Sequence, residues 1–167
     1  MRIILLIIIS ICINQSALAQ QKIVVLDFEL NDITSLPNIP AEITRTAGLS
    51  GLLKSALQAN GEYQLIEIDA ASQRRANASF GYLFNHREIA AKLAESYGAD
   101  WVLVSQHSKP SFLFSQMWTY LVKVDQQQAV ARYDVELKGN HQLVSQHAVN
   151  NLAGKIMQDI NKYKDSR

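Results

Sequence analysis

The sequence contains a single cysteine, Cys12, which lies in an N-terminal segment with the pattern of a signal peptide. Cleavage of that segment leaves a chain without cysteine. Such a chain can hold no disulfide, no thiolate-bound metal and no cysteine nucleophile. Small exported domains are often stabilised by disulfides. Because the mature chain has no cysteine, this domain must depend on core packing alone, for which about 150 residues are sufficient.

The sequence also has little net charge, only +1 at pH 7. Sixteen Lys and Arg residues stand against fifteen Asp and Glu residues, and removal of Arg2 with the leader leaves fifteen of each. The longest basic cluster, Arg74–Arg75, is typical of solvated surface. Nucleic-acid binding requires a basic patch that neutralises phosphates, so this balance excludes a nucleic acid as the partner.

No motif for catalysis, metal binding or cofactor binding stands out. The four histidines are His86, His107, His141 and His147. The last two are six residues apart, whereas two ligands on one face of a helix need a spacing of three or four. Ser50 lies in Gly48–Gly51, which lacks the Gly-x-Ser-x-Gly elbow. We therefore predict no catalytic residue, no metal and no cofactor; a hydrolase would need a pocket that joins a histidine, a carboxylate and a hydroxyl.

The N-terminal segment has the three parts that export requires. Arg2 supplies a positive charge, Ile3–Ile13 is apolar apart from two residues, and Ala17–Ala19 offers small residues for cleavage before Gln20. A membrane anchor would need about 20 apolar residues, and a lipoprotein would need small residues before Cys12. We expect a signal peptide over residues 1–19, a single domain over residues 20–167 without a membrane span, and a location in a bacterial periplasm.

The pattern of apolar residues predicts a single α/β (α+β) domain that resembles a three-layer fold. β-branched runs and alternation indicate strands, and apolar stripes with three- to four-residue spacing indicate helices. The expected elements, in order, are a strand over 22–30, a helix over 44–57, a strand over 63–68, a helix that begins at residue 85 or 86 and runs to 97, strands over 101–106, 114–124 and 129–138, and a helix over 143–163. This order, β-α-β-α-β-β-β-α, predicts a mixed sheet with a long hairpin. Residues 69–81 have no clear pattern.

Three carboxylates near the end of the first predicted strand form one candidate site. Asp27 and Glu29 are two residues apart, so on a strand they would share a face, and Asp32 follows in the loop beyond the strand. Ligands often bind at such strand ends in open α/β sheets. The three residues predict either a site for a cation or cationic ligand, or a polar strand end in which Asp32 organises the turn.

Aromatic residues at the start of the hairpin form the second candidate site. If alternation holds, Phe112, Phe114, Trp118 and Tyr120 share one face of the strand. That face is either core or a surface for a protein partner. The edge of the hairpin could also pair with a peptide or with a second copy of the chain.

Several segments resemble a family of predicted secreted bacterial proteins of unknown function, in the same order along nearly the whole mature chain. They are Val25–Leu30, Glu42–Ala47 (EITRTA), Gly98–Val104, Lys109–Leu113 and Lys138–Asn140. Members of that family often carry a cysteine pair where this chain has Asn85 and His86, and Thr-Asp with a tryptophan where it has His141–Leu143. The resemblance therefore does not imply a redox or binding role for this chain at those positions.

More distantly, the pattern of strand, Asp-Phe, loop, helix and strand resembles the amino-terminal domain of TolB. It also resembles the periplasmic domains of curli-secretion lipoproteins and of lipoproteins that activate penicillin-binding proteins. The resemblance implies an α/β module that contacts other envelope proteins. We therefore expect a non-enzymatic binding or adaptor module; the alternatives are a carrier of a small ligand or cation and an uncharacterised hydrolase.

Overall fold

The computed structural model describes residues 20–59, 63–138 and 141–165, which form one three-layer α/β domain. The predicted signal peptide, residues 1–19, lies outside the described residues. A mixed six-stranded sheet forms the middle layer, with the strand order β3-β1-β4-β5-β6 and with β2 paired to β4. The predicted fold class is confirmed.

The parallel half of the sheet is built around strand β1 (Gln21–Val25). This strand lies between β3 (Tyr63–Ile66) and β4 (Trp101–Lys109) and is parallel to both. Strand β2 (Glu29–Asp32) continues the line of β1 and pairs in parallel with the second half of β4. Two short strands therefore pair with the two halves of β4 on one side, β1 with residues 101–103 and β2 with residues 106–109.

The antiparallel half of the sheet is the predicted long hairpin. Strand β5 (Ser115–Lys123) pairs with β4 and with β6 (Gln128–Leu137), both antiparallel. The turn between β5 and β6 places Gln127 at a φ of 53°, the left-handed conformation that tight turns use. The ends of both strands differ from the ends predicted by the sequence pattern by a single residue.

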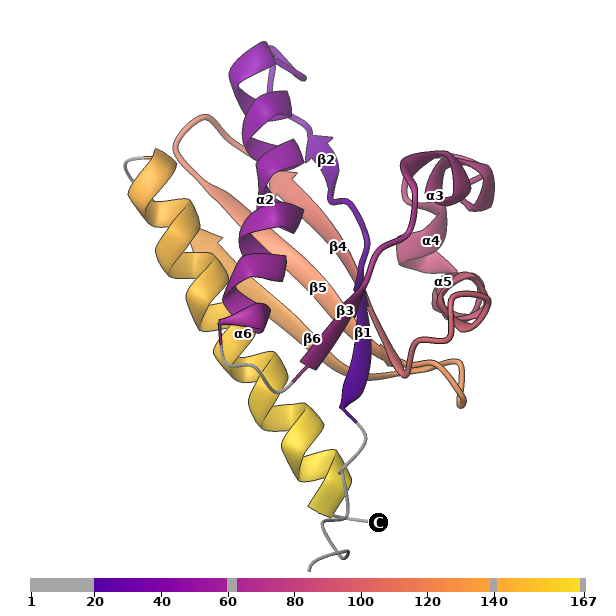
Figure 1. Cartoon of the computed structure of the whole chain (residues 1–167). Helices are drawn as coiled ribbons and strands as arrows, with labels where there is room; N and C mark the ends of the chain where they lie inside the picture. The colour runs from indigo at the N-terminus through magenta and orange to yellow at the C-terminus, as the bar shows by residue number, and fades with distance from the viewer. Residues whose placement is uncertain (1–19, 60–62, 139–140, 166–167) are drawn as a thin grey trace, which may run out of the picture.

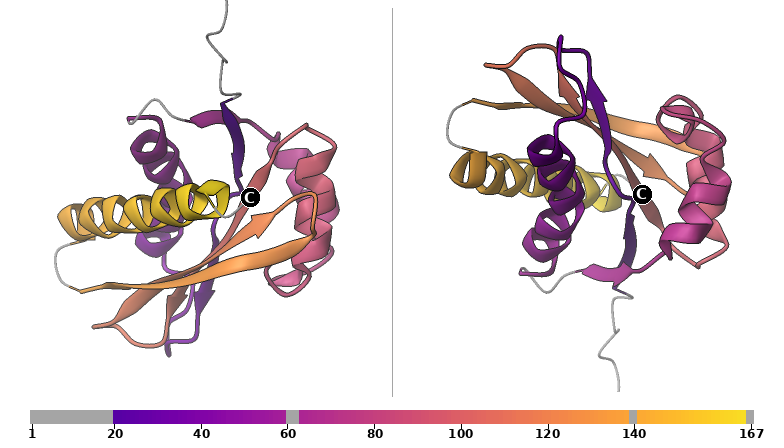
Figure 2. Two further views of the ribbon diagram at one scale, coloured as in Figure 1. Left: turned by 90° about the horizontal axis from the view of Figure 1, so that it is seen from below. Right: turned by 90° about the horizontal axis from the view of Figure 1, so that it is seen from above.

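Helices cover both faces of the sheet, as Figures 1 and 2 show. The long helices α2 (Pro40–Gln58) and α6 (His141–Asp165) lie side by side on one face. The short helices α3 (Ala70–Ala76), α4 (Tyr82–Asn85) and α5 (Arg87–Glu95) lie on the other face. None of the helices within the described residues has the length and apolarity needed to cross a membrane.

Alternate residues of β4 supply two separate apolar cores. Trp101 and Leu103 pack with α2 and α6, whereas Val102 and Val104 pack with α4 and α5. The larger core takes its helical residues from one stripe of each long helix: Leu49, Leu53 and Leu57, and Val149, Leu152, Ile156 and Ile160. Burial on both faces explains why residues 23–25 of β1 and the first half of β4 are continuous apolar runs.

The predicted strand over 22–30 is interrupted in the structure. β1 ends at Val25 and β2 begins at Glu29, and these residues lie opposite Leu103 and Gln106 of β4. The four-residue advance from Val25 to Glu29 therefore corresponds to an advance of only three residues along β4, from Leu103 to Gln106. One extra residue shifts the alternation of side chains by one position. Odd-numbered residues of β1 and even-numbered residues of β2 therefore lie on the same face of the sheet.

The predicted strand over 101–106 is longer than expected. β4 continues through His107, Ser108 and Lys109, all of which are buried. β2 pairs with this half of β4 on one side and β5 pairs with it on the other, so its backbone is satisfied although its side chains are polar. The fold thus carries polar side chains into the space under α2.

Two glycines adopt the left-handed conformation, and their replacement has a measurable cost. A Cβ at Gly81 (φ 73°) would lie 3.3 Å from the side-chain nitrogens of Asn85 and Gln106, whereas a Cβ at Gly98 (φ 71°) would meet nothing within 4 Å. We expect Gly98→Ala to cost about 1 kcal/mol from φ alone. Gly81→Ala should cost more in urea unfolding, and an equal cost would contradict the contact.

Candidate functional site

The structure does not bring the three predicted carboxylates to one site: Asp27 and Glu29 both line a small pocket, but Asp32 does not, and the side chains of Asp27 and Glu29 have partners on opposite sides of the sheet. Asp27 accepts a hydrogen bond from Ser50 of α2, on one side of the sheet. Glu29 accepts hydrogen bonds from the Asn77 side chain and the Gly81 backbone, on the other side. The expectation that Asp27 and Glu29 share a face is wrong, because the extra residue between β1 and β2 reverses the alternation.

Asp32 organises a turn, one of the two roles expected for it. Its Oδ1 accepts from the backbone and the hydroxyl of Thr34 at 3.0 and 2.7 Å, and its Oδ2 accepts from the Asn38 backbone at 3.0 Å. These hydrogen bonds and the charge of Lys109 outweigh the effect of burial and lower the pKa of Asp32. Within the described ranges, no three His, Cys, Asp or Glu side chains converge on a metal site.

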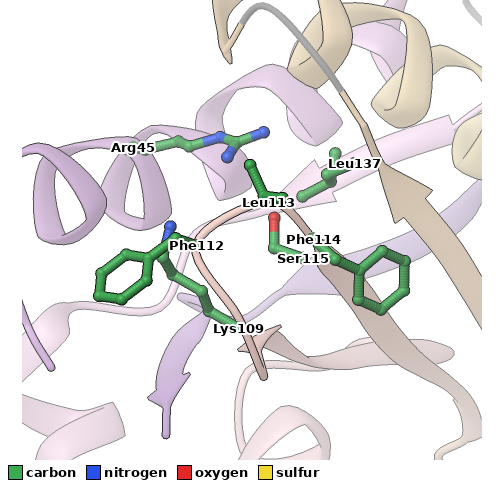
Figure 3. Close-up of a pocket in the computed structure, with 7 residues that line it drawn as sticks. All are labelled: Arg45, Lys109, Phe112, Leu113, Phe114, Ser115 and Leu137. Carbon is green, nitrogen blue, oxygen red and sulfur yellow. The ribbon is translucent and has the colours of Figure 1, made fainter. Parts of the chain in front are cut away.

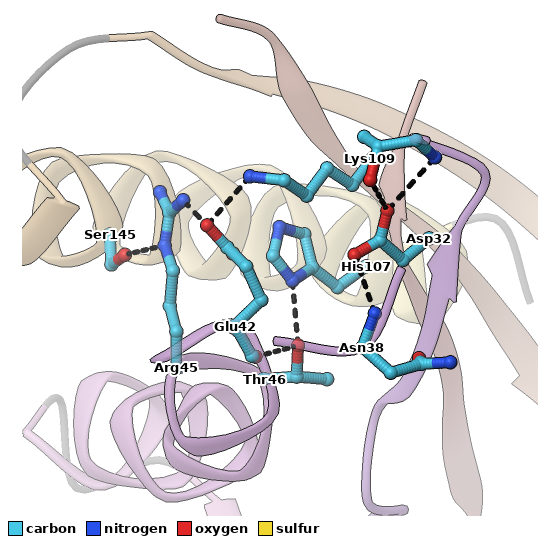
Figure 4. A network of polar contacts seen from close by, with 9 residues as sticks. Asp32, Asn38, Glu42, Arg45, Thr46, His107, Lys109 and Ser145 are labelled. Atoms are coloured by element: carbon cyan, nitrogen blue, oxygen red, sulfur yellow. Dashed lines mark hydrogen bonds and ion pairs between the residues drawn. The ribbon is translucent and has the colours of Figure 1, made fainter. Parts of the chain in front are cut away.

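The structure instead assembles a buried cluster of charged side chains beneath the start of α2 (Figure 4). Lys109, at the end of β4, lies 2.7 Å from Glu42 of α2, and the two side chains are only 5% and 3% exposed. The guanidinium of Arg45 lies 3.7 Å from Glu42, and its Nε donates to Ser145 of α6 at 3.0 Å. Burial alone would raise the pKa of Glu42, but Lys109 and Arg45 hold it below its ordinary value.

His107 lies beside this cluster and is neutral at pH 7. Its Nδ1 is 2.7 Å from the hydroxyl of Thr46, and that hydroxyl donates its one hydrogen to the carbonyl of Glu42. His107 Nδ1 must therefore carry the proton and donate to Thr46. Burial, and next the charge of Arg45, lower the pKa of His107 to about 4.

These contacts do not make a hydrolase site out of His107 and Thr46. An imidazole that donates to a hydroxyl cannot also remove the proton of that hydroxyl, so it does not activate Thr46 as a nucleophile. Both residues are also buried and lie outside the lining of the neighbouring pocket. His86 pairs with Glu88 at the surface and His147 is exposed on α6, while the side chain of His141 lies outside the described residues.

The low pKa of His107 predicts a pH-dependent stability. The imidazole binds a proton near pH 6.5 in the unfolded chain but only near pH 4 in the folded one, so stability is full above pH 6.5 and falls toward pH 4. We expect a loss of about 3 kcal/mol across this window from His107. Urea unfolding at pH 7 and pH 4.5 measures it, with His107→Asn as the control in which most of this loss disappears.

A pocket of about 230 Å³ opens next to the cluster, at the end of the sheet (Figure 3). Its charged and polar lining consists of Arg45, Lys109 and Ser115. Its apolar lining comes from the link between β4 and β5 and from the end of β6: Phe112, Leu113, Phe114 and Leu137. The pocket therefore places a guanidinium beside apolar side chains, a combination that suits a ligand with both an anionic and an apolar part.

The four aromatics predicted to share a face fall into two groups. Phe112 and Phe114 line the pocket, whereas Trp118 and Tyr120 pack against the smaller core on the other side of the sheet. The guanidinium of Arg87 covers the ring of Tyr120 at 4.5 Å from the ring centroid. The prediction of one common face is wrong because residues 110–114 lie outside both strands, so the alternation of β5 does not extend back to them.

Sequence reasoning missed the residues of the charged cluster. Glu42, Arg45, Thr46 and Lys109 gave no motif, because charged residues in a helix and at a strand end usually face solvent. One signal was present: segments 42–47 and 109–113 both carry the family resemblance, and the Glu42–Lys109 ion pair joins them in space.

The fold and the site define a small three-layer α/β domain with a charged, apolar-edged pocket at one end of its sheet. A family model, DUF3280, described as a protein of unknown function (DUF2380), matches residues 21–157. The chain belongs to this family, and the family resemblance inferred from the sequence is confirmed. No curated protein matches the sequence.

Solved structures of several bacterial proteins are similar to this domain. The LpoB C-terminal domain from Salmonella enterica is 18% identical with a TM-score of 0.50, covering 75% of this chain and 87% of that chain. A PelC dodecamer from Paraburkholderia phytofirmans is 13% identical with a TM-score of 0.53, covering 81% and 87%. TolB from Acinetobacter baumannii is 16% identical with a TM-score of 0.49, covering 82% and 28%. The LpoB and PelC similarities establish the fold.

Proposed function

We propose that this protein is a non-enzymatic binding module that docks another envelope protein at the pocket end of its sheet. The main support is the exposure of large apolar side chains at that end, where β2 ends, α2 and α6 begin and β4 turns into β5 (Figure 1). These side chains, which together we call the apolar rim, are Ile33, Leu36, Ile39, Ile43, Phe112, Leu113 and Leu143.

The strongest support from the apolar rim is the exposure of its side chains in the link between β4 and β5. Leu113 is 91% exposed and Phe112 is 54% exposed, although both also line the pocket. Exposed apolar side chains that cluster on one part of a surface mark sites that bind proteins or ligands. The buried charges of Arg45 and Lys109 would then supply specificity, and the rim would supply apolar contact area.

We further propose that the domain acts in the bacterial periplasm. This rests on the signal-peptide pattern of residues 1–19 and on the resemblance to envelope interaction domains.

Self-association through the edge of β6 belongs to the same proposal, since within the described residues β6 pairs with β5 alone. The similar PelC from Paraburkholderia phytofirmans forms a dodecamer, so the oligomeric state of this chain is worth measuring. A monomer mass in light scattering at all concentrations would contradict self-association.

Site-specific photocrosslinking in the native host tests the docking surface. A photoreactive phenylalanine replaces Leu113 in the rim, and a matched variant carries it at Gln126, in the turn between β5 and β6. We expect a discrete adduct with one envelope protein from position 113 and none from position 126. Adducts of equal yield from both positions, or none from position 113, would contradict the proposal.

A further inference from the structure

The pocket is lined by a buried cationic side chain, Arg45, with one hydrogen-bond donor that has no acceptor among the described residues. Arg45 is only 10% exposed, and within the described part of the chain its Nη2 has no hydrogen-bond acceptor. Figure 3 shows its guanidinium beside Leu113 and Leu137, at the edge of the pocket. A buried donor without an acceptor destabilises the folded protein, and a ligand oxygen that accepts from it removes that cost.

The charge of the cluster fits a ligand with one negative charge. Arg45 and Lys109 each contribute one positive charge, and Glu42, which pairs with both, contributes one negative charge, so the three side chains sum to +1. Asp32 is the next carboxylate, but both of its oxygens are already engaged by hydrogen bonds from Thr34 and Asn38. A carboxylate carries the one negative charge that balances this sum, whereas the charge of a phosphate group, about −1.5 to −2, exceeds it.

The size and the apolar lining of the pocket indicate what the carboxylate is attached to. A volume of about 230 Å³ is smaller than the ~300–1,000 Å³ of pockets for drug-sized ligands, and it suits a group of the size of one residue. Phe112 and Leu113 line one part of the pocket and Leu137 lines another. The group beside the carboxylate should therefore be apolar.

We propose that the pocket binds the C-terminal residue of a partner protein, with the α-carboxylate on Arg45 and an apolar side chain against Phe112 and Leu113. A charge-assisted hydrogen bond from a guanidinium is among the strongest that a carboxylate can accept in a protein. The apolar rim outside the pocket offers contacts to the residues that precede the terminus, which an isolated fatty acid would leave unused. This inference rests on the proposed docking function and specifies its ligand.

Isothermal titration of the purified protein with small probes tests the inference. The main probe is the peptide acetyl-Gly-Ser-Leu with a free carboxylate, compared with the same peptide as an amide. We expect the acid to bind at least tenfold more tightly than the amide, since one charge-assisted hydrogen bond contributes about 1.4 kcal/mol or more. A peptide acid that ends in serine should also bind more weakly than the one that ends in leucine.

Three variants connect the affinity to the pocket. Arg45→Met should weaken binding of the peptide acid about tenfold, and Arg45→Lys, which keeps the charge, should restore part of it. Arg132→Met is the matched control, because Arg132 is exposed on β6 and lies over the rings of Trp118 and Tyr120. Leu113→Ser guards against a folding defect in the Arg45 variants, since a side chain this exposed can be shortened without loss of core; it should weaken the peptide with terminal leucine.

The outcomes separate this inference from the docking proposal. Equal affinity for acid and amide, no binding at all, or unchanged affinity in Arg45→Met would overturn the carboxylate pocket. Tighter binding of octanoate than of the peptide acid would assign the pocket to a lipid carboxylate, and tighter binding of inorganic phosphate would overturn the charge argument; both contradict the proposal. A crosslink from position 113 that persists in Arg45→Met would leave the docking surface intact while removing the role of Arg45.

Discussion

Replacement of Lys109 by methionine is expected to lower the free energy of unfolding by about 3 kcal/mol, the low end of the range for breaking a buried ion pair. Methionine has a similar length but no charge, so the buried carboxylate of Glu42 loses its 2.7 Å partner. Arg45 remains 3.7 Å away and limits the loss. Urea unfolding monitored by circular dichroism measures the change, which corresponds to a fall of the melting temperature of about 10 °C.

The matched control is Lys138→Met. Lys138 makes an ion pair with Glu136 at 2.6 Å, a similar distance, but the two side chains are 66% and 56% exposed. An exposed pair contributes about 0–1 kcal/mol because water and salt screen it. The double variant Glu42→Gln with Lys109→Met should regain part of the lost stability, since it also removes the buried negative charge. Similar losses for Lys109→Met and Lys138→Met would show that the cluster is solvated.

Replacement of Trp101 by alanine is expected to have a larger effect, about 4 kcal/mol. Trp101 is fully buried at the start of β4, its indole Nε1 donates to the Gln21 side chain at 2.9 Å, and the ring of Tyr163 meets it edge-on. Alanine would leave a cavity between the sheet and α6 and would remove the donor to the Gln21 amide oxygen. Thermal unfolding in the absence of ligands measures the change.

Trp118→Ala provides the comparison for this prediction. Trp118 is half-buried on the other face of the sheet, where it packs against the smaller core and Arg132 covers it at 5.7 Å. We expect a cost below about 2 kcal/mol, because its burial is partial and the cavity can fill with water. Equal costs for the two tryptophans would contradict the placement of Trp101 in the main core.

The fold was predictable from the sequence because apolar spacing decides it. The stripe of Leu49, Leu53 and Leu57 identifies the core face of α2, and it meets Trp101 and Leu103 of the apolar run 101–104 in the larger core. The break between β1 and β2 was not predictable, because it depends on the register with β4 and not on any residue type. Ladder register is a tertiary property, set by which strands become neighbours.

The candidate site was only partly predictable, for a similar reason. Phe112 was chosen as a partner-surface residue and lies in the proposed site, although the reason given, a shared strand face with Trp118, is wrong. Arg45 and Lys109 are far apart in the sequence, and either residue alone would be taken for ordinary solvated charge. Only the packing of α2 over the second half of β4 turns them into a buried cluster.

Peptide mapping of the adduct formed from position 113 is the most direct test of the carboxylate pocket as a docking site. The protein with a photoreactive phenylalanine at position 113 is irradiated in its native host, the adduct is digested, and mass spectrometry identifies the crosslinked partner peptide. We predict the C-terminal peptide of one envelope protein, with an apolar last residue and with a yield that falls in Arg45→Met. An internal peptide of the partner, with a yield unchanged in Arg45→Met, would contradict the proposed binding mode.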